Sequence, residues 1–196
     1  TQAAAAAAAA AQVEAARIAA HQERLRLEAE AEEEIRCAEA EFEADVRASL
    51  RKFYHMASGD VDLTTFTPKA ADDQLFTGMA DPGKLGPWCS ESDLDFYTQA
   101  FQHSGFRGPL NYYRAQDLTW ELTAGSPTTI QQPALFMAGD RDGVIMMAAE
   151  ALQAMPQHVP NLQINELIPG AGHWTQQEAP AEVNRGILKF LEGLSV

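Results

Sequence analysis

The feature that most constrains the fold is a pair of short apolar runs near the C-terminus, each followed by a loop with polar side chains. The first run covers 133–138 and stops at Gly139, and the second covers 162–168 and stops at Pro169. Apolar runs of this length that end at glycine or proline are typical of strands buried on both faces of a parallel sheet. We therefore predict an α/β fold in which both strands are apolar on both faces and end at the same edge of the sheet.

The loops after these runs carry two aspartates and a histidine. Asp140 and Asp142 follow the first run, and His173 follows the second. In an open α/β sheet, residues just past the carboxyl ends of the strands are the ones that meet ligands. A carboxylate beside an imidazole at that edge is the base-and-orienter half of a nucleophile–histidine–acid triad. The alternative is that both aspartates only cap the loop that follows them.

Three segments together resemble one enzyme family. The run 139–145 (GDRDGVI), followed about thirty residues later by 172–174 (GHW), is similar to the end of an α/β-hydrolase chain, where the acid precedes the histidine. The segment 105–114 (GFRGPLNYYR) resembles the cap of the soluble epoxide hydrolases, the bacterial ones in particular. The similarity covers 38–194 and implies a partial α/β-hydrolase fold, with a helical cap followed by the last strands and helices of the core.

The resemblance implies a role for the two polar loops. It makes Asp142, the third residue of Asp-Arg-Asp, the acid of the triad, with Asp140 as its rival. It makes His173 the general base that activates water against an ester intermediate. The ionised acid would fix the tautomer of the imidazole and stabilise the imidazolium.

The resemblance also implies roles for aromatic residues. Tyr113 matches a cap tyrosine that donates a hydrogen bond to the epoxide oxygen, because a phenol keeps its proton until negative charge builds on that oxygen. Tyr112 and Trp174 are the expected substrate-binding residues, Tyr112 through packing and Trp174 as a wall of the site. The alternative for the two tyrosines is ordinary cover of a helix. A small epoxide is the implied substrate, and no metal or organic cofactor is implied.

The parts of the family's site that precede the cap have no counterpart in this sequence. The family's nucleophile is an aspartate at a strand-to-helix elbow, but no Gly-x-Asp-x-Gly or Gly-x-Ser-x-Gly stands before Ala38. The run 139–143 has arginine at the nucleophile's position, and the place of a second cap tyrosine falls near Ala31. An N-terminal half that is lost, cut or supplied by another chain would account for this. We expect no epoxide turnover by this chain alone.

The chain is predicted to have three regions. Residues 1–37 contain an alanine run and many glutamates but no glycine or proline, which predicts a solvated helical arm. A coiled-coil partner for this arm is the alternative. Residues 38–125 form the predicted cap, whose first helix covers 38–58, and residues 126–196 form the C-terminal part of the core.

Two groups of apolar residues have a predicted position in the cap. In the loop 61–88, residues such as Phe66, Leu75 and Phe76 either line a pocket over the substrate entrance or only anchor the loop. Trp120 and Leu122, near the end of the cap, are predicted to pack against the sheet.

Charge and cysteine content limit the partners and the compartment. The net charge of −14, from 14 basic and 28 acidic residues, argues against nucleic acid and anionic membranes as partners. No stretch approaches the roughly 20 apolar residues of a membrane span. Two cysteines without metal or redox spacing, Cys37 and Cys89, favour a cytoplasmic protein.

Two other functional classes stay open. One is a catalytically inactive interaction module, with self-association or a complementing chain as the partner. The other is a related α/β-hydrolase activity such as dehalogenation, against which the tyrosines of 105–114 argue.

Overall fold

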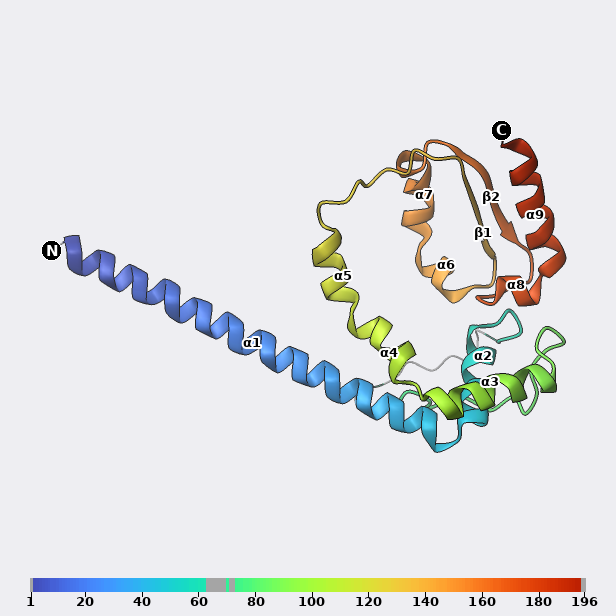
Figure 1. The fold of residues 1–196 in the computed structure, drawn as a ribbon, viewed down its shortest axis with the longest axis horizontal. Coiled ribbons are helices and arrows are strands. Elements are labelled where there is room, and N and C mark those ends of the chain that lie inside the picture. The colour runs from blue at the N-terminus through green and yellow to red at the C-terminus, as the bar shows by residue number, and fades with distance from the viewer. Residues whose placement is uncertain (1, 63–69, 71–72, 195–196) are drawn as a thin grey trace.

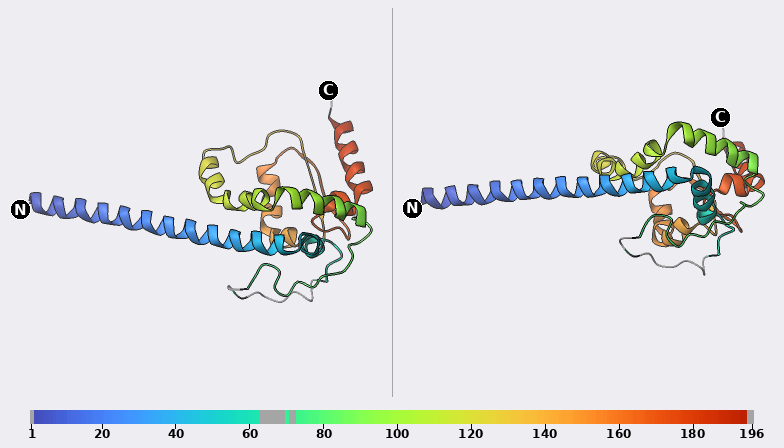
Figure 2. Two further views of the ribbon diagram at one scale, coloured as in Figure 1. Left: turned by 60° about the horizontal axis from the view of Figure 1, so that its bottom comes forward. Right: turned by 90° about the horizontal axis from the view of Figure 1, so that it is seen from below.

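The computed structural model describes residues 2–62, 70 and 73–194. Figure 1 shows a long helix, α1 (Gln2–Ala44), that extends away from a body of shorter helices and a small sheet. The side chains of 11–27 along this helix are exposed, and the views in Figure 2 show it clear of the body over most of its length. The predicted N-terminal Ala/Glu-rich helix is confirmed, and the described side chains of 11–27 are exposed as expected for a solvated helix.

The predicted boundary after residue 37 lies inside this helix. α1 continues to Ala44, and Phe42 near its end is already buried in the body. The break comes at Asp45, whose side chain accepts a hydrogen bond from the Ala48 amide at the start of α2 (Val46–Ala57). The single helix predicted for 38–58 is therefore wrong, because an aspartate N-cap in its middle begins a second helix.

The helical part of the body packs around one hydrophobic cluster. α3 (Glu91–Ser104) begins at a capping box of Ser90 and Asp93 and ends at Gly105, whose φ of 68° lies in the left-handed region. The buried members of the cluster come from α1, α2, α3 and the segments between α2 and α4; they are Phe42, Val46, Leu50, Leu85, Cys89, Leu94 and Phe106. This cluster holds α2 and α3 together beside the end of α1.

The loop between α2 and α3 is anchored by this cluster. Leu75 and Phe76 are partly buried and pack against it, and Phe42 meets the ring of Phe76 edge-on at 4.9 Å. Of the two alternatives, the structure favours anchoring for these residues. Phe66 lies outside the described residues.

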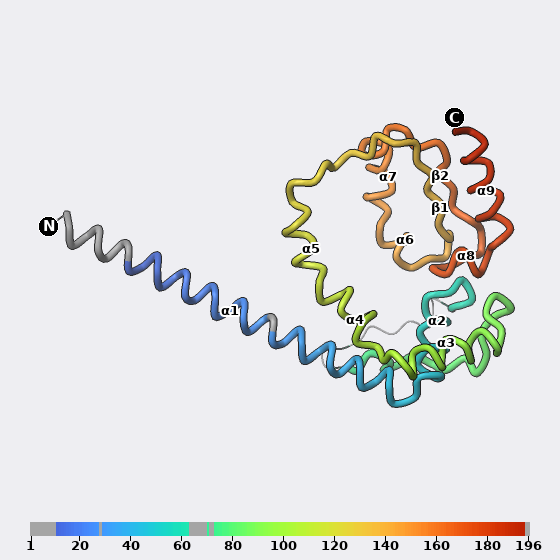
Figure 3. The backbone as a smooth tube through the Cα atoms, in the orientation of Figure 1, coloured from blue at the N-terminus to red at the C-terminus, as the bar shows by residue number. Residues whose placement is uncertain are grey.

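The sheet part contains two parallel strands, β1 (Ala134–Gly139) and β2 (Leu162–Ile168). The other elements of this part are helices that follow the strands: α6 (Gly143–Met147), α7 (Ala149–His158), α8 (Thr175–Glu178) and α9 (Pro180–Gly193). Figures 1 and 3 show α7 and α9 on opposite sides of the strands. A smaller buried cluster of Ile168, Ala171 and Val183 joins the end of β2 to α9.

The prediction that both strands are apolar on both faces is wrong for β2. Gln163 and Asn165 are exposed, whereas their neighbours Leu162 and Ile164 are half-buried. This alternation is typical of a strand with only one covered face.

Two short helices connect the helical part to the sheet part. They are α4 (Arg107–Arg114) and α5 (Gln116–Thr123), and Figure 3 shows α5 standing apart from the strands. Trp120 and Leu122 are 80% and 76% exposed, so the prediction that they pack against the sheet is wrong. The reason is that 116–123 forms a further helix before the chain returns to β1. None of the helices in the described part of the chain is both long and apolar enough to cross a bilayer.

Candidate functional site

The loops after β1 and β2 begin side by side. The ladder pairs Gly139 with Ile168 and continues past the strands, because the Asp140 amide donates to the Ile168 carbonyl at 3.1 Å. The backbones then come so close that a Cβ on Gly139 would lie 2.1 Å from the Ala171 carbonyl oxygen. Glycine is thus required here, and it brings the two polar loops together.

Asp142 and His173 meet across these loops, which confirms the predicted contact. Nδ1 of His173 lies 3.0 Å from Oδ2 of Asp142. The Asp142 side chain is only 9% exposed, whereas the imidazole is 46% exposed. A carboxylate at Nδ1 favours the tautomer with its proton on that nitrogen, which leaves Nε2 as the basic atom.

The two interpretations of the aspartates do not exclude each other. Oδ1 of Asp142 accepts a hydrogen bond from the Val144 amide at 2.9 Å and so caps α6, while Oδ2 faces His173. Asp140 does not compete for the histidine, because its Oδ1 accepts from the Gly170 amide at 2.7 Å. Asp142 therefore has its direction set by a helix start, and Asp140 ties the two loops to each other.

The loop that carries His173 is held by the end of α2. The His173 amide donates to the Ala57 carbonyl at 2.8 Å, and the Trp174 indole Nε1 donates to the Tyr54 carbonyl at 2.8 Å. The rings of Tyr54 and Trp174 also meet edge-on at 5.0 Å. Contacts between residues so far apart in the chain leave no local pattern, so the sequence does not predict this support from α2.

Trp174 lines a pocket between α2, α3 and α8. The pocket has a volume of about 370 Å³, and its lining consists of Tyr54, Trp88, Cys89, Asp93, Tyr97, Trp174 and Gln177. Burial, with smaller contributions from Tyr97 and Cys89, raises the pKa of Tyr54 to about 12. The pocket is mainly aromatic, as sites for apolar ligands usually are.

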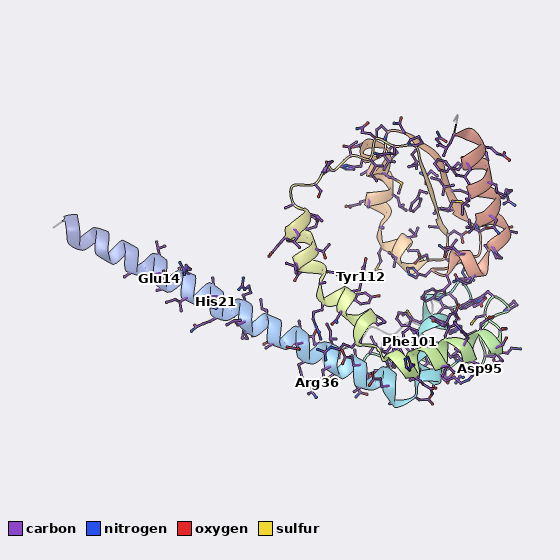
Figure 4. All side chains as sticks on the ribbon, viewed as in Figure 1. Glu14, His21, Arg36, Asp95, Phe101 and Tyr112 are labelled. Carbon is purple, nitrogen blue, oxygen red and sulfur yellow. The ribbon has the colours of Figure 1, made fainter. Side chains whose placement is uncertain are left out.

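The tyrosines of 105–114 stand on α4 without a partner for their hydroxyl groups among the described residues. Tyr112 is 75% and Tyr113 is 58% exposed, and their rings meet edge-on at 5.8 Å. Figure 4 shows Tyr112 on α4, beyond the end of α3 that carries Phe101. The structure thus brings Asp142 and His173 together but does not place either tyrosine in contact with them. Within the described residues, no group of three or more histidine, cysteine, aspartate or glutamate side chains has the arrangement of a metal site.

The chain matches known proteins by sequence and by structure. Epoxide hydrolase B of Mycobacterium tuberculosis is 35% identical over 79% of this chain and 50% of its own length. The structure of an epoxide hydrolase from an endophytic Streptomyces matches 80% of this chain and 48% of its own, with 39% identity and a TM-score of 0.73. That of epoxide hydrolase A from Mycobacterium thermoresistibile matches 81% and 50%, with 33% identity and a TM-score of 0.70.

This chain is homologous to the α/β-hydrolase epoxide hydrolases. The resemblance and the α/β-hydrolase fold class expected from the sequence are confirmed. The chain spans about half the length of the bacterial relatives named above. Its sequence matches no family model.

Proposed function

We propose that Asp142 and His173 form the water-activating part of an epoxide hydrolase site, which converts an epoxide to a vicinal diol. The observation that carries the proposal is the 3.0 Å contact between His173 Nδ1 and Asp142 Oδ2, in which the acid is nearly buried and the base is accessible. The relatives, which are named epoxide hydrolases, support the choice of substrate class.

The arrangement suits the second half of a two-step hydrolysis. A carboxylate first opens the epoxide and forms an ester, with the oxygen of the broken C–O bond taking a proton. Nε2 of His173 then removes a proton from water while the water oxygen attacks the ester carbonyl carbon. As the tetrahedral intermediate collapses, the ester C–O bond breaks and the imidazolium protonates the departing diol oxygen. The carboxyl group left behind releases a proton to solvent, which restores the carboxylate and balances the proton taken up in ring opening. Asp142 stabilises the imidazolium between these transfers.

The remaining predicted roles form part of the same proposal. Tyr113 would donate a hydrogen bond to the epoxide oxygen during ring opening, with Tyr112 and Trp174 in contact with the substrate; the match of 105–114 to the family's cap supports this. In this view residues 38–125 form the cap and residues 126–196, with the two strands, belong to the core. The two free thiols, Cys37 and Cys89, support a cytoplasmic location.

An ester substrate tests the proposal directly, because it bypasses the step that needs a nucleophilic carboxylate. The wild-type chain should hydrolyse p-nitrophenyl acetate faster than buffer alone does. His173→Ala should lower that rate about 100-fold, the usual contribution of a general base. His21→Ala, which removes an exposed histidine of α1, is the matched control and should leave the rate unchanged. Equal rates for the wild type and His173→Ala would reject the proposal.

Binding of a complementing polypeptide is a second candidate role for this chain. The apolar surface of the sheet part and its connectors favours it. The exposed large apolar side chains there include Leu118, Trp120, Leu122, Val144, Met146 and Met147. Exposed apolar patches of this kind mark interaction surfaces. We propose that they pack against the segment that carries the nucleophile, whether in the same polypeptide or another. Stable monomers of the 196-residue chain in size-exclusion chromatography, with no binding of a fluorescent apolar dye, would argue against this role.

A further inference from the structure

One carboxylate connects the histidine loop to the end of α2. Oε2 of Glu178 accepts hydrogen bonds from the Gly59 amide at 2.7 Å and the Gly172 amide at 2.9 Å, and Oε1 accepts one from the Trp174 amide at 3.1 Å. Gly59 follows α2, whereas the other two donors flank His173. Bonds from N–H groups to an ionised acceptor are stronger than those between neutral groups.

The two segments that Glu178 joins are in direct backbone contact. A Cβ on Gly172 would lie 2.3 Å from the Gly59 nitrogen, and a Cβ on Gly59 would lie 2.1 Å from the Gly170 carbonyl oxygen. Real side chains do not approach backbone atoms so closely, so this contact needs glycine in both segments. The carboxylate thus bridges two backbones that are already close together.

The amides of three consecutive residues are therefore all held. The Gly172 and Trp174 amides bind Glu178, and the His173 amide between them binds the Ala57 carbonyl. Fixing the peptide units on both sides of His173 fixes the direction of its Cα–Cβ bond. Asp142 is oriented independently, through its cap on α6.

We infer that Glu178 is a positioning residue for His173, which sets the imidazole opposite Asp142 without touching the substrate. The catalytic consequence rests on the proposed function, but the effect on the imidazole does not. A carboxylate that only joined α2 to the histidine loop would influence stability and leave the His173–Asp142 contact unchanged.

Glu178→Gln is the sharpest variant, because it keeps the volume of the side chain. Its amide oxygen replaces only one carboxylate oxygen, and its NH₂ group faces backbone donors, so at least one hydrogen bond is lost. Glu178→Ala removes all three. Glu192→Gln, on an exposed position of α9, removes the same charge and is the matched control.

The test compares these variants by NMR and by ester hydrolysis. In Glu178→Gln, the Gly172 and Trp174 amides should exchange about tenfold faster, as expected for loss of a charge-assisted hydrogen bond. The His173 Nδ1 proton should exchange faster too, and hydrolysis should fall several-fold in kcat with little change in KM. Glu192→Gln should match the wild type in each respect. Faster amide exchange with a wild-type ring proton and rate, or no change at all, would overturn the inference.

Two further outcomes are distinguishable. If the wild type shows no His173-dependent hydrolysis, the proposed function fails, and the ring proton still decides the role of Glu178. If the Glu178 variants do not fold, hydrogen exchange in the wild-type protein decides whether Glu178 positions His173. The His173 ring proton and the Gly172 and Trp174 amides should then share one opening rate, and a ring proton that exchanges independently of them would overturn the inference.

Discussion

The loop that carries His173 and the helix that carries Tyr113 match the same family, yet they are held very differently. The His173 loop is bound to α2 and α8 through its backbone, and its partner Asp142 is bound to α6. Tyr113 stands on α4, more than half exposed, without a hydrogen bond to its hydroxyl among the described residues. Contacts within this chain therefore determine the geometry of the Asp142–His173 pair, but not that of the Tyr113 phenol.

The largest effect, on the free energy of unfolding, should come from the hydrophobic cluster that packs α2, which holds the His173 loop, against α3. Leu94 is 1% exposed and lies on α3, which packs against α2. Leu94→Ala should lower the free energy of unfolding by about 3 kcal/mol, because it removes buried methyl groups and leaves a cavity. Urea denaturation followed by circular dichroism measures this, and a loss below about 1 kcal/mol would show that the helical part does not depend on this cluster.

A smaller effect is expected from the acid of the pair. Asp142→Asn should slow ester hydrolysis about thirtyfold, equivalent to about 2 kcal/mol, since asparagine cannot stabilise an imidazolium as a carboxylate does. Stability should change little, because asparagine is also a good N-cap for α6. Asp140→Asn, which keeps an acceptor for the Gly170 amide, is the control. A larger loss of activity in Asp140→Asn would reassign the acid.

The ion pair of Arg51 and Asp81 should contribute less to the free energy of unfolding, and its contribution should depend on pH. Hydrogen bonds from the Arg51 side chain and, to a smaller extent, from the Gly83 amide lower the pKa of Asp81 from 3.8 to about 2. A lowered pKa stabilises the fold above pH 3.8, and this contribution disappears as the pH falls toward 2. Asp81→Asn should cost about 1 kcal/mol at pH 7, after allowance for solvent screening, and only a small fraction of that at pH 2. A cost that is the same at both pH values would mean that the pair does not tie α2 to the loop before α3.

The smallest effect is expected in the exposed connector. Trp120→Ala on α5 should change the free energy of unfolding by less than about 0.5 kcal/mol, because the indole is exposed and buries little surface. Urea denaturation alongside Leu94→Ala makes the comparison direct. A cost near that of Leu94→Ala would show that α5 packs in solution, for example against another molecule.

Local signals in the sequence predicted what local chemistry determines. The capping box at Ser90 and the glycine after α3 are local features of this kind, because each acts within one turn of helix. The meeting of Asp142 and His173 was predicted because parallel strands end at one edge. The Asp45 break in the predicted cap helix was also a local signal, but it was overlooked within a run of strong helix formers.

The sequence did not predict contacts that depend on the whole fold. Glu178 binds the Gly59 amide across a separation of 119 residues, and no spacing rule indicates that pair. Trp120 and Leu122 were assigned to the sheet on their apolar character alone, which does not say which surface is available to cover them. Gly59 and Gly172 are visible in the sequence, but only the structure shows that the two segments that carry them touch.

Amide hydrogen exchange of the wild-type protein tests the central claim most directly. If contacts within this chain hold Asp142 and His173 in place, the Gly172, His173 and Trp174 amides should exchange at least 100-fold more slowly than those of α5, which has little packing to protect it. Equal protection in both regions, or unprotected exchange at these three residues, would contradict the claim that this chain alone sets the position of His173.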